Sequence, residues 1–249
     1  KWFSGTRPTE FEDYKSLTGE NGTIHVGMTD TDPPISYQNE DILTGFDLEY
    51  IILFAREYGY KFEPSTVDFE FILGSVQTGK YDLAIGGITI TDERKEILNF
   101  TDVYYQSPVV MVTKGYNSET THLSDLAGKR VGVMTGSIQA VMMPELVPDA
   151  EYMEFNSISD LIAALNSNKI DAFGCDESLY TSMLWEGQAV DRIDEPLDKS
   201  NYGLIFPKGK RKELQNEVNE FIATMSADGT LKALEEKWFG AKEPTEFAS

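Results

Sequence analysis

The sequence predicts an α/β protein shaped as a clamshell of two similar lobes, each an open sheet flanked by helices. Three observations predict this fold. The chain has 249 residues, 41% of them hydrophobic, which is enough for two lobes with separate cores. Strand and helix patterns alternate in two successive blocks that resemble each other. Chain crossings near 112–116 and 200–204 would join the blocks as two hinge segments.

The first block begins with a short strand at residues 24–28. This strand runs into a turn at Asp32-Pro33-Pro34, because the two prolines fix φ and exclude a strand ladder. The elements expected next are a helix from Gly45 to Gly59, a strand at 61–63, a helix over 71–79 and a buried strand at 81–85. This order is typical of a sheet with crossover connections.

The second block repeats the pattern, and Asn168-Lys169-Ile170-Asp171-Ala172 echoes Gly79-Lys80-Tyr81-Asp82-Leu83 of the first. Its expected elements are a strand at 109–112, a short helix at 123–126, a strand at 131–134, a helix after Ser137, a Ser-capped helix at 158–165 and a strand at 170–174. A late strand at 202–207 and a helical stretch over 211–235, interrupted at Asp228-Gly229, follow. The expected lobes are therefore 23–113 with 203–240, and 114–202.

Composition excludes several classes of partner. The formal net charge of −21 gives no basic footprint for nucleic acid, and anionic lipid would repel the chain. The single cysteine, Cys175, rules out an internal disulfide. No run approaches the ~20 apolar residues that span a bilayer, and residues 1–5 lack a signal-peptide core, so we expect a mature or excised fragment. No motif indicates a metal, a cofactor or a catalytic triad.

The two ends of the chain carry a repeat. Lys1-Trp2-Phe3 matches Lys237-Trp238-Phe239, and Pro8-Thr9-Glu10-Phe11 matches Pro244-Thr245-Glu246-Phe247. A repeat spaced by a whole domain predicts tandem copies of that domain. Residues 1–22 would then be the tail and linker of a preceding copy, and 241–249 a C-terminal linker. The alternative is one protein whose ends match by chance.

The most informative segment follows the strand at 81–85. Gly86-Gly87 leaves backbone polar groups accessible at the end of a buried strand, where a ligand can approach closely. Thr91 is placed to cap the helix that carries Arg94. The planar guanidinium group of Arg94 suits bidentate binding of a carboxylate. The alternative is an exposed Arg94 paired with Glu93 or Glu96.

Five motifs occur in order along the chain: Gly45-Phe46-Asp47-Leu48-Glu49, Gly86-Gly87-Ile88-Thr89-Ile90-Thr91-x-x-Arg94, Phe100-Thr101-Asp102-x-Tyr104-Tyr105, Leu126-x-Gly128-Lys129-x-Val131-Gly132-Val133, and Asp228-Gly229-Thr230-x8-Trp238-Phe239-Gly240. Together they resemble the polar-amino-acid solute-binding proteins of ABC importers, which have the type II periplasmic-binding-protein fold. The resemblance implies an extracytoplasmic protein, tethered or fused to the membrane, that binds a free L-α-amino acid. It also implies delivery of this ligand to an ABC permease.

The resemblance implies roles for five residues. Arg94 would clamp the ligand α-carboxylate, together with Thr89 and with backbone N–H groups near Ser137 at a helix start. Asp176 would pair with the α-ammonium group, together with the carbonyl of Gly87. The alternative for Asp176 is a surface acid, although it directly follows the buried strand at 170–174.

The side-chain pocket contains one departure from the family. Phe69 would form an apolar wall, with core packing as its alternative, and Met134 and Cys175 match pocket-lining positions. Where relatives have a Tyr or Phe before the proline turn, this chain has Asp32. A buried carboxylate needs a cationic partner, which favours a ligand with a basic side chain. A solvent-exposed Asp32 in the turn is the alternative.

Two other functions are consistent with these sequence features. An enzyme such as a dehydratase or lyase uses the same fold, but neither His25 nor His122 is placed as a general acid or base, so we expect no catalysis. A sensory domain of a membrane kinase or cyclase would bind the same ligand by the same clamp. The repeat favours an importer, since several receptors raise the local ligand supply at one permease. We expect the protein to be a monomer.

Overall fold

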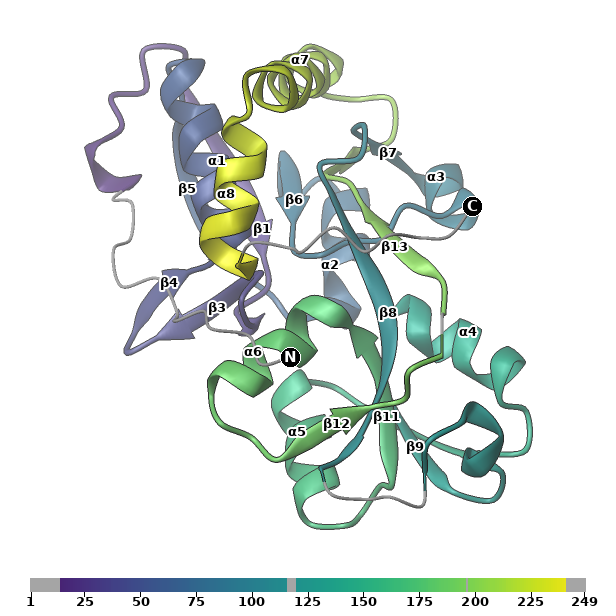
Figure 1. Cartoon of the computed structure of the whole chain (residues 1–249). Helices are drawn as coiled ribbons and strands as arrows, with labels where there is room; N and C mark the ends of the chain where they lie inside the picture. The colour runs from purple at the N-terminus through teal and green to yellow at the C-terminus, as the bar shows by residue number, and fades with distance from the viewer. Residues whose placement is uncertain (1–13, 116–119, 196, 241–249) are drawn as a thin grey trace.

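The computed structural model describes residues 14–115, 120–195 and 197–240, and it shows two lobes, one above the other in Figure 1. Each lobe has its own sheet with helices on both faces. The predicted two-lobed α/β architecture is thus confirmed. No helix among the described residues is long and apolar enough to cross a membrane.

The first lobe contains a five-stranded sheet in the order β5-β1-β6-β14-β7. Its strands are β1 (Thr23–Met28), β5 (Lys61–Thr66), β6 (Leu83–Ile85), β7 (Leu98–Phe100) and β14 (Ile205–Pro207). The helices of this lobe are α1 (Phe46–Glu57), α2 (Phe69–Gln77), α3 (Asp92–Ile97), α7 (Lys212–Asp228) and α8 (Thr230–Phe239), with a 3-10 turn η1 at Tyr14–Ser16. β5, β1 and β6 are parallel, whereas β14 is antiparallel to both of its neighbours.

The second lobe contains a six-stranded sheet with the main order β10-β9-β11-β8-β12, and β13 also pairs with β8. Its strands are β8 (Tyr105–Lys114), β9 (Arg130–Met134), β10 (Glu151–Phe155), β11 (Ala172–Asp176), β12 (Val190–Arg192) and β13 (Lys199–Tyr202). Its helices are α4 (Ile138–Leu146), α5 (Ile158–Asn166) and α6 (Glu177–Trp185), with a 3-10 turn η2 at Leu123–Leu126. β10, β9 and β11 are parallel, and β8 is antiparallel to β11.

Two paired strands connect the lobes. The first half of β8, Tyr105–Pro108, pairs with β13, whereas Val109–Thr113 pairs with β11 in the second sheet. In Figure 1, β8 and β13 run side by side from one lobe to the other. We therefore propose that the hinge lies at Tyr105–Pro108 and at β13, and that the first crossing precedes the range 112–116 expected from sequence.

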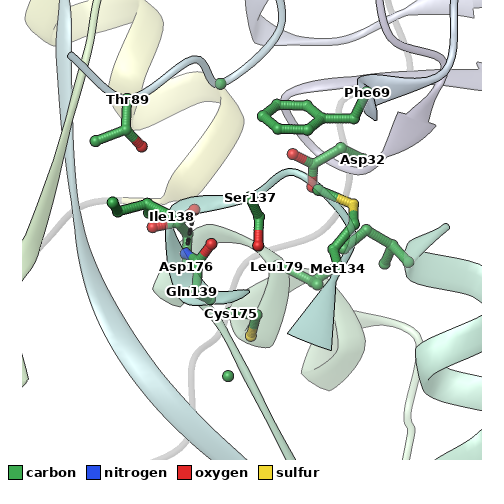
Figure 2. A pocket seen from close by; sticks show the side chains of 13 residues that line it. Asp32, Phe69, Thr89, Met134, Ser137, Ile138, Gln139, Cys175, Asp176 and Leu179 are labelled. Carbon is green, nitrogen blue, oxygen red and sulfur yellow. Dashed lines mark hydrogen bonds between the residues drawn. The ribbon is translucent and has the colours of Figure 1, made fainter. Parts of the chain in front are cut away.

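A small sheet interrupts the first lobe where the sequence predicts only a turn. β2 (Thr31–Asp32), β3 (Ser36–Asn39) and β4 (Ile42–Thr44) are antiparallel, and Asp32 pairs with Ser36. The two prolines lie between β2 and β3, so the turn itself occurs as expected. The short β2 ends at Asp32, which orients this side chain toward the space between the lobes (Figure 2).

Side-chain caps begin the helices that matter for the site. The Thr91 hydroxyl accepts a hydrogen bond from the Arg94 N–H (3.2 Å), which confirms the predicted cap of α3. Ser137 caps α4 in the same way, since its hydroxyl accepts from the Ala140 N–H at 3.3 Å. A missing cap costs typically ~1 kcal/mol, so these residues stabilise the helices and fix where each one begins.

The core of the first lobe includes the end of α8. The Glu49 carboxylate accepts hydrogen bonds from Lys237 Nζ (2.7 Å to each oxygen) and from Trp238 Nε1 (2.8 Å). The ring of Phe239 stacks on that of Tyr105, with centroids 4.5 Å apart. The sequence Lys237-Trp238-Phe239 therefore anchors the last helix to α1 and to the hinge strand.

Candidate functional site

A cavity lies between the lobes, and Figure 2 shows side chains from both of them around it. Its lining residues are Asp32, Phe69, Gly87, Thr89, Met134, Ser137, Ile138, Gln139, Ile158, Gly174, Cys175, Asp176 and Leu179. Including its opening to solvent, the space measures about 430 Å³. Side chains from both lobes surround this space, an arrangement typical of a small-molecule site between two domains.

Seven of the eight residues predicted for the site line this cavity, and Arg94 lies directly behind its wall. Asp32, Phe69, Gly87 and Thr89 come from the first lobe. Met134, Ser137 and Asp176 come from the second lobe. The structure thus brings the predicted residues together, while their roles in binding stay predictions.

Arg94 is buried, with 9% of its surface exposed, and contacts both lobes. Its Nη1 donates to the carbonyl of Thr89 (2.8 Å) and its Nη2 to the carbonyl of Gly136 in the second lobe (3.0 Å). In the described part of the chain no carboxylate pairs with it, which argues against the exposed pair with Glu93 or Glu96. Of the five N–H donors of a guanidinium, three stay free for another partner.

Burial acts on the charge of Arg94. Desolvation lowers the pKa of Arg94 from its ordinary value, and the nearby Glu93 opposes this shift. A buried cation without a carboxylate partner is costly, and an anion in the cavity would reduce that cost. The arrangement therefore suits a ligand with a planar anionic group.

The beginning of α4 provides further donors beside Arg94. The first N–H groups of a helix have no partner within the helix, and together with the helix dipole they attract anions. Ser137 itself is not such a donor, because its N–H bonds the carbonyl of Met134 (3.0 Å). The next two residues, Ile138 and Gln139, line the cavity. The expected anion contact near Ser137 thus belongs to the residues that follow it.

Asp176 lies at the end of β11 and is only partly paired. Its Oδ2 accepts a hydrogen bond from Gln139 Nε2 (3.2 Å), whereas its Oδ1 is buried without a partner. Burial raises the pKa of Asp176, and the nearby polar side chains of Ser200, Tyr202 and Gln139 oppose the shift. A cation bound at Oδ1 would satisfy this oxygen and favour the ionised form.

Asp32 lies on the first-lobe side of the cavity, close to Gly87. A Cβ added to Gly87 would lie 3.5 Å from Asp32 Oδ2, so the two residues are neighbours. Within the described residues, no hydrogen bond or ion pair engages the Asp32 carboxylate. Burial, and then the charges of Asp176 and Asp47, raise the pKa of Asp32 to about 8. The carboxylate is therefore oriented into the cavity and lacks a cationic partner.

The remaining walls of the cavity are apolar. Phe69 lies next to Asp32 in Figure 2, with Met134 on the opposite lobe below it. Ile158, Cys175 and Leu179 complete this part of the lining. A ligand side chain that enters here meets hydrocarbon and sulfur along its length and can reach a charge only at Asp32 or Asp176.

Five lining residues were not among those expected from the sequence: Ile138, Gln139, Ile158, Gly174 and Leu179. Ile138 and Gln139 follow the cap Ser137, and their position at a helix start was the only available signal. Ile158 and Leu179 belong to helices whose apolar positions are typical of residues that pack in a hydrophobic core. No metal site is formed by His, Cys, Asp and Glu side chains in the ranges that the structure covers.

Fold and site together define a two-lobed protein whose lobes surround a cavity that suits a small molecule with an anionic and a cationic group. Residues 24–241 match the family of bacterial extracellular solute-binding proteins, family 3, and the chain belongs to this family. Its location is accordingly extracytoplasmic.

Individual relatives agree with this assignment. The chain is 31% identical over 211 residues to the arginine-binding extracellular protein ArtP of Bacillus subtilis (strain 168), covering 83% of this chain and 82% of ArtP. It is 31% identical over 225 residues to the L-cystine-binding protein TcyJ of Escherichia coli (strain K12), covering 89% and 84%. An ancestral arginine-binding protein bound to arginine superposes with a TM-score of 0.82 at 32% identity, covering 90% of this chain and all (100%) of that structure.

Proposed function

We propose that this protein binds a free L-α-amino acid outside the cytoplasm and delivers it to the membrane subunits of an ABC importer. The observation that carries the proposal is a pair of buried groups at one small cavity: Arg94, behind its wall, has no carboxylate partner in the described chain, and Asp176, in its lining, has one oxygen without a hydrogen-bond partner. An α-amino acid carries one anion and one cation on adjacent carbons. It would pair with both groups at once.

Each part of the ligand has a matching set of groups. The α-carboxylate would bind Arg94, the Thr89 hydroxyl and the first turn of α4. The α-ammonium group would bind Asp176 and the carbonyl of Gly87, both of which line the cavity. The side chain would extend between Phe69 and the apolar residues of the second lobe.

We further propose a ligand with a basic side chain. Asp32 supplies a second carboxyl group that has no partner, and its pKa of about 8 keeps it mostly protonated at neutral pH unless a cation lies beside it and favours the ionised form. A lysine, arginine or ornithine side chain would supply the missing cation. Relatives whose names specify arginine support this choice, whereas TcyJ is named for L-cystine.

The test is a thermal-shift screen of the twenty amino acids, followed by calorimetry on those that raise the unfolding temperature. A ligand at 100 times its Kd stabilises the native state by about 2.7 kcal/mol, which the screen detects easily. We expect the basic amino acids to give the largest shifts. A screen in which no amino acid shifts the unfolding temperature would refute the proposed function.

Ligand binding is expected to close the two lobes. The Arg94–Gly136 hydrogen bond joins the lobes at the site, so the structure corresponds to a closed arrangement. Rotation about β8 and β13 would open it, since these paired strands link the lobes. Small-angle scattering should give a smaller radius of gyration at saturating ligand, with a profile that fits Figure 1. The same profile with and without ligand would contradict a hinged clamshell.

We also propose adjacent binding-domain copies in the same polypeptide. Lys237-Trp238-Phe239 is an anchor of the domain fold, whereas the matching residues 1–3 lie outside the described residues. Part of the predicted linker contacts this lobe, because Tyr14 packs on Phe62 with ring centroids 5.1 Å apart. Sequencing the gene on either side of this segment tests the proposed tandem array, which requires another copy of residues 23–240 in the same reading frame.

Two other functions fit the fold less well. The relatives named above are binding proteins, although one 29% identical structure is described as an ancestral amino-acid-binding protein and a precursor of cyclohexadienyl dehydratase. Incubation of the protein with amino acids and prephenate-like acids should give no turnover. A sensor fused to a kinase would bind the same ligands, and a permease gene beside this one distinguishes the importer.

A further inference from the structure

Asp47 is a buried acid that the site has not yet explained. It lies in the first turn of α1, where it is fully buried (0% exposed), and it does not line the cavity. It forms no ion pair with any cation in the described ranges. An isolated buried carboxylate is destabilising, so its presence at this position calls for a role other than stability.

Both oxygens of Asp47 accept hydrogen bonds from groups at the site. Oδ1 accepts from the Tyr104 hydroxyl (2.8 Å), and Oδ2 accepts from the backbone N–H of Gly87 (3.2 Å). Gly87 itself lines the cavity. The carboxylate thus holds Gly87 from behind the cavity wall, with Tyr104 fixing the orientation of the carboxylate.

The backbone of Gly87 depends on such support. Its φ of +62° lies in the left-handed region, which glycine adopts without steric cost but does not adopt uniquely. Without the bond to Asp47, the peptide units around Gly87 could rotate among several conformations. Among the residues described, none donates a hydrogen bond to the Gly87 carbonyl, so this acceptor is left for a ligand.

We propose that Asp47 is a positioning residue for the ammonium group of the ligand: it holds the Gly87 N–H and thereby presents the Gly87 carbonyl to the cavity. When it is ionised, Asp47 also adds to the negative potential at the Gly87 end of the cavity. This inference rests on the proposed amino-acid function and assigns a specific residue to it. Asp47 acts through Gly87 and does not itself touch the ligand.

Asp47→Asn tests the proposal, because the amide is similar in size but places an NH₂ group against one of the two donors. We expect about a tenfold loss of affinity for every amino acid that the wild type binds, since all share the ammonium group. Tyr104→Phe should weaken binding in the same uniform way. Glu49→Gln is the matched control: it alters another buried acid of α1, bonded to Lys237 and Trp238, and should lower stability with unchanged affinity.

The NMR signal of the Gly87 amide gives a readout that a purely structural role would not move. Burial raises the pKa of Asp47 to about 7, opposed by its bonds to Tyr104 and Gly87. In an Asp32→Asn background, which removes the neighbouring carboxyl group, the Gly87 amide shift should therefore titrate near neutral pH when Asp47 is present and not in Asp47→Asn. Tyr50 on α1, Tyr104 before β8, Tyr202 on β13 and Asp32 on β2 are the other titratable groups of the described residues that face this region.

The outcomes separate this inference from the proposed function. A wild type that binds no amino acid would refute the function itself. A wild type that binds, together with an Asp47→Asn variant of the same affinity, would overturn the role of Asp47 alone. A loss confined to basic ligands would also overturn it, since it would move Asp47 from the ammonium group to the side chain.

Discussion

Arg94→Ala is expected to abolish amino-acid binding while leaving the fold intact. No Lys, Arg or His of the described residues lines the cavity, and the Arg94 guanidinium directly behind its wall would pair there with the ligand carboxylate. Removal of one partner from a buried charge pair typically costs ~2–5 kcal/mol, which corresponds to a loss of roughly thirty- to several thousand-fold in affinity. Calorimetry on the variant measures this loss directly.

Two further variants show whether charge or geometry is responsible. Arg94→Lys keeps the positive charge but cannot form a two-pronged bond, so we expect an intermediate affinity. Arg130→Ala is the matched control, because Arg130 forms a two-pronged ion pair with Asp171 away from the cavity. It should leave Kd unchanged. Near-native affinity of Arg94→Ala would remove this residue from the binding site.

The elements that the sequence predicted well are those with a strong hydrophobic signal. β6 is buried at every position and α5 has a clear apolar face, so both appear close to the expected residues. Edge strands such as β10 (Glu151–Phe155) were missed, because most of their side chains are exposed or half-buried and no alternation marks them. β2 was missed because two residues before a proline pair contain no strand pattern at all.

The site residues that could be predicted are those that occur in short sequence motifs. Gly87, Thr89 and Arg94 occur within eight positions of each other, so one local motif placed all three. Gln139 lies in none of the five motifs, and Asp47 occurs in the first of them without any role following from it. From the sequence, Asp47 is an acid in the first turn of α1 that interacts favourably with the helix dipole. Only the folded chain brings the Gly87 N–H within 3.2 Å of its carboxylate.

The raised pKa of the buried Asp32 predicts that the folded state becomes less stable as the pH rises. Asp32 has a pKa of about 8 in the folded state against an ordinary value of 3.8, so between these values the folded state binds more protons than the unfolded state. The free energy of unfolding therefore falls as pH rises from 4 to 8. Ligand-free Asp32→Asn should be more stable than the wild type at pH 8, by roughly 5 kcal/mol, and nearly equally stable at pH 4. Urea unfolding at both pH values measures the difference.

Asp32→Phe is expected to change which amino acids the protein prefers. This substitution introduces the ring that the family resemblance implies at this position and removes the carboxylate from the cavity. Lysine and arginine should then bind about tenfold more weakly, because Coulomb attraction to Asp32 is lost, although relief of desolvation limits the effect. Leucine and glutamine should bind more tightly, since a ring beside Phe69 adds apolar contact area.

The measurement is a titration of lysine, glutamine and leucine against the wild type, Asp32→Phe and Asp32→Asn. Asp30→Asn serves as the control, because this acid lies two residues away in the same turn and does not line the cavity. An equal loss for all three ligands in Asp32→Asn would place Asp32 at the α-ammonium group, next to Gly87 and Asp176. An unchanged ranking in Asp32→Phe would show that Asp32 does not contact the ligand, and that Phe69, Met134 and Cys175 determine specificity.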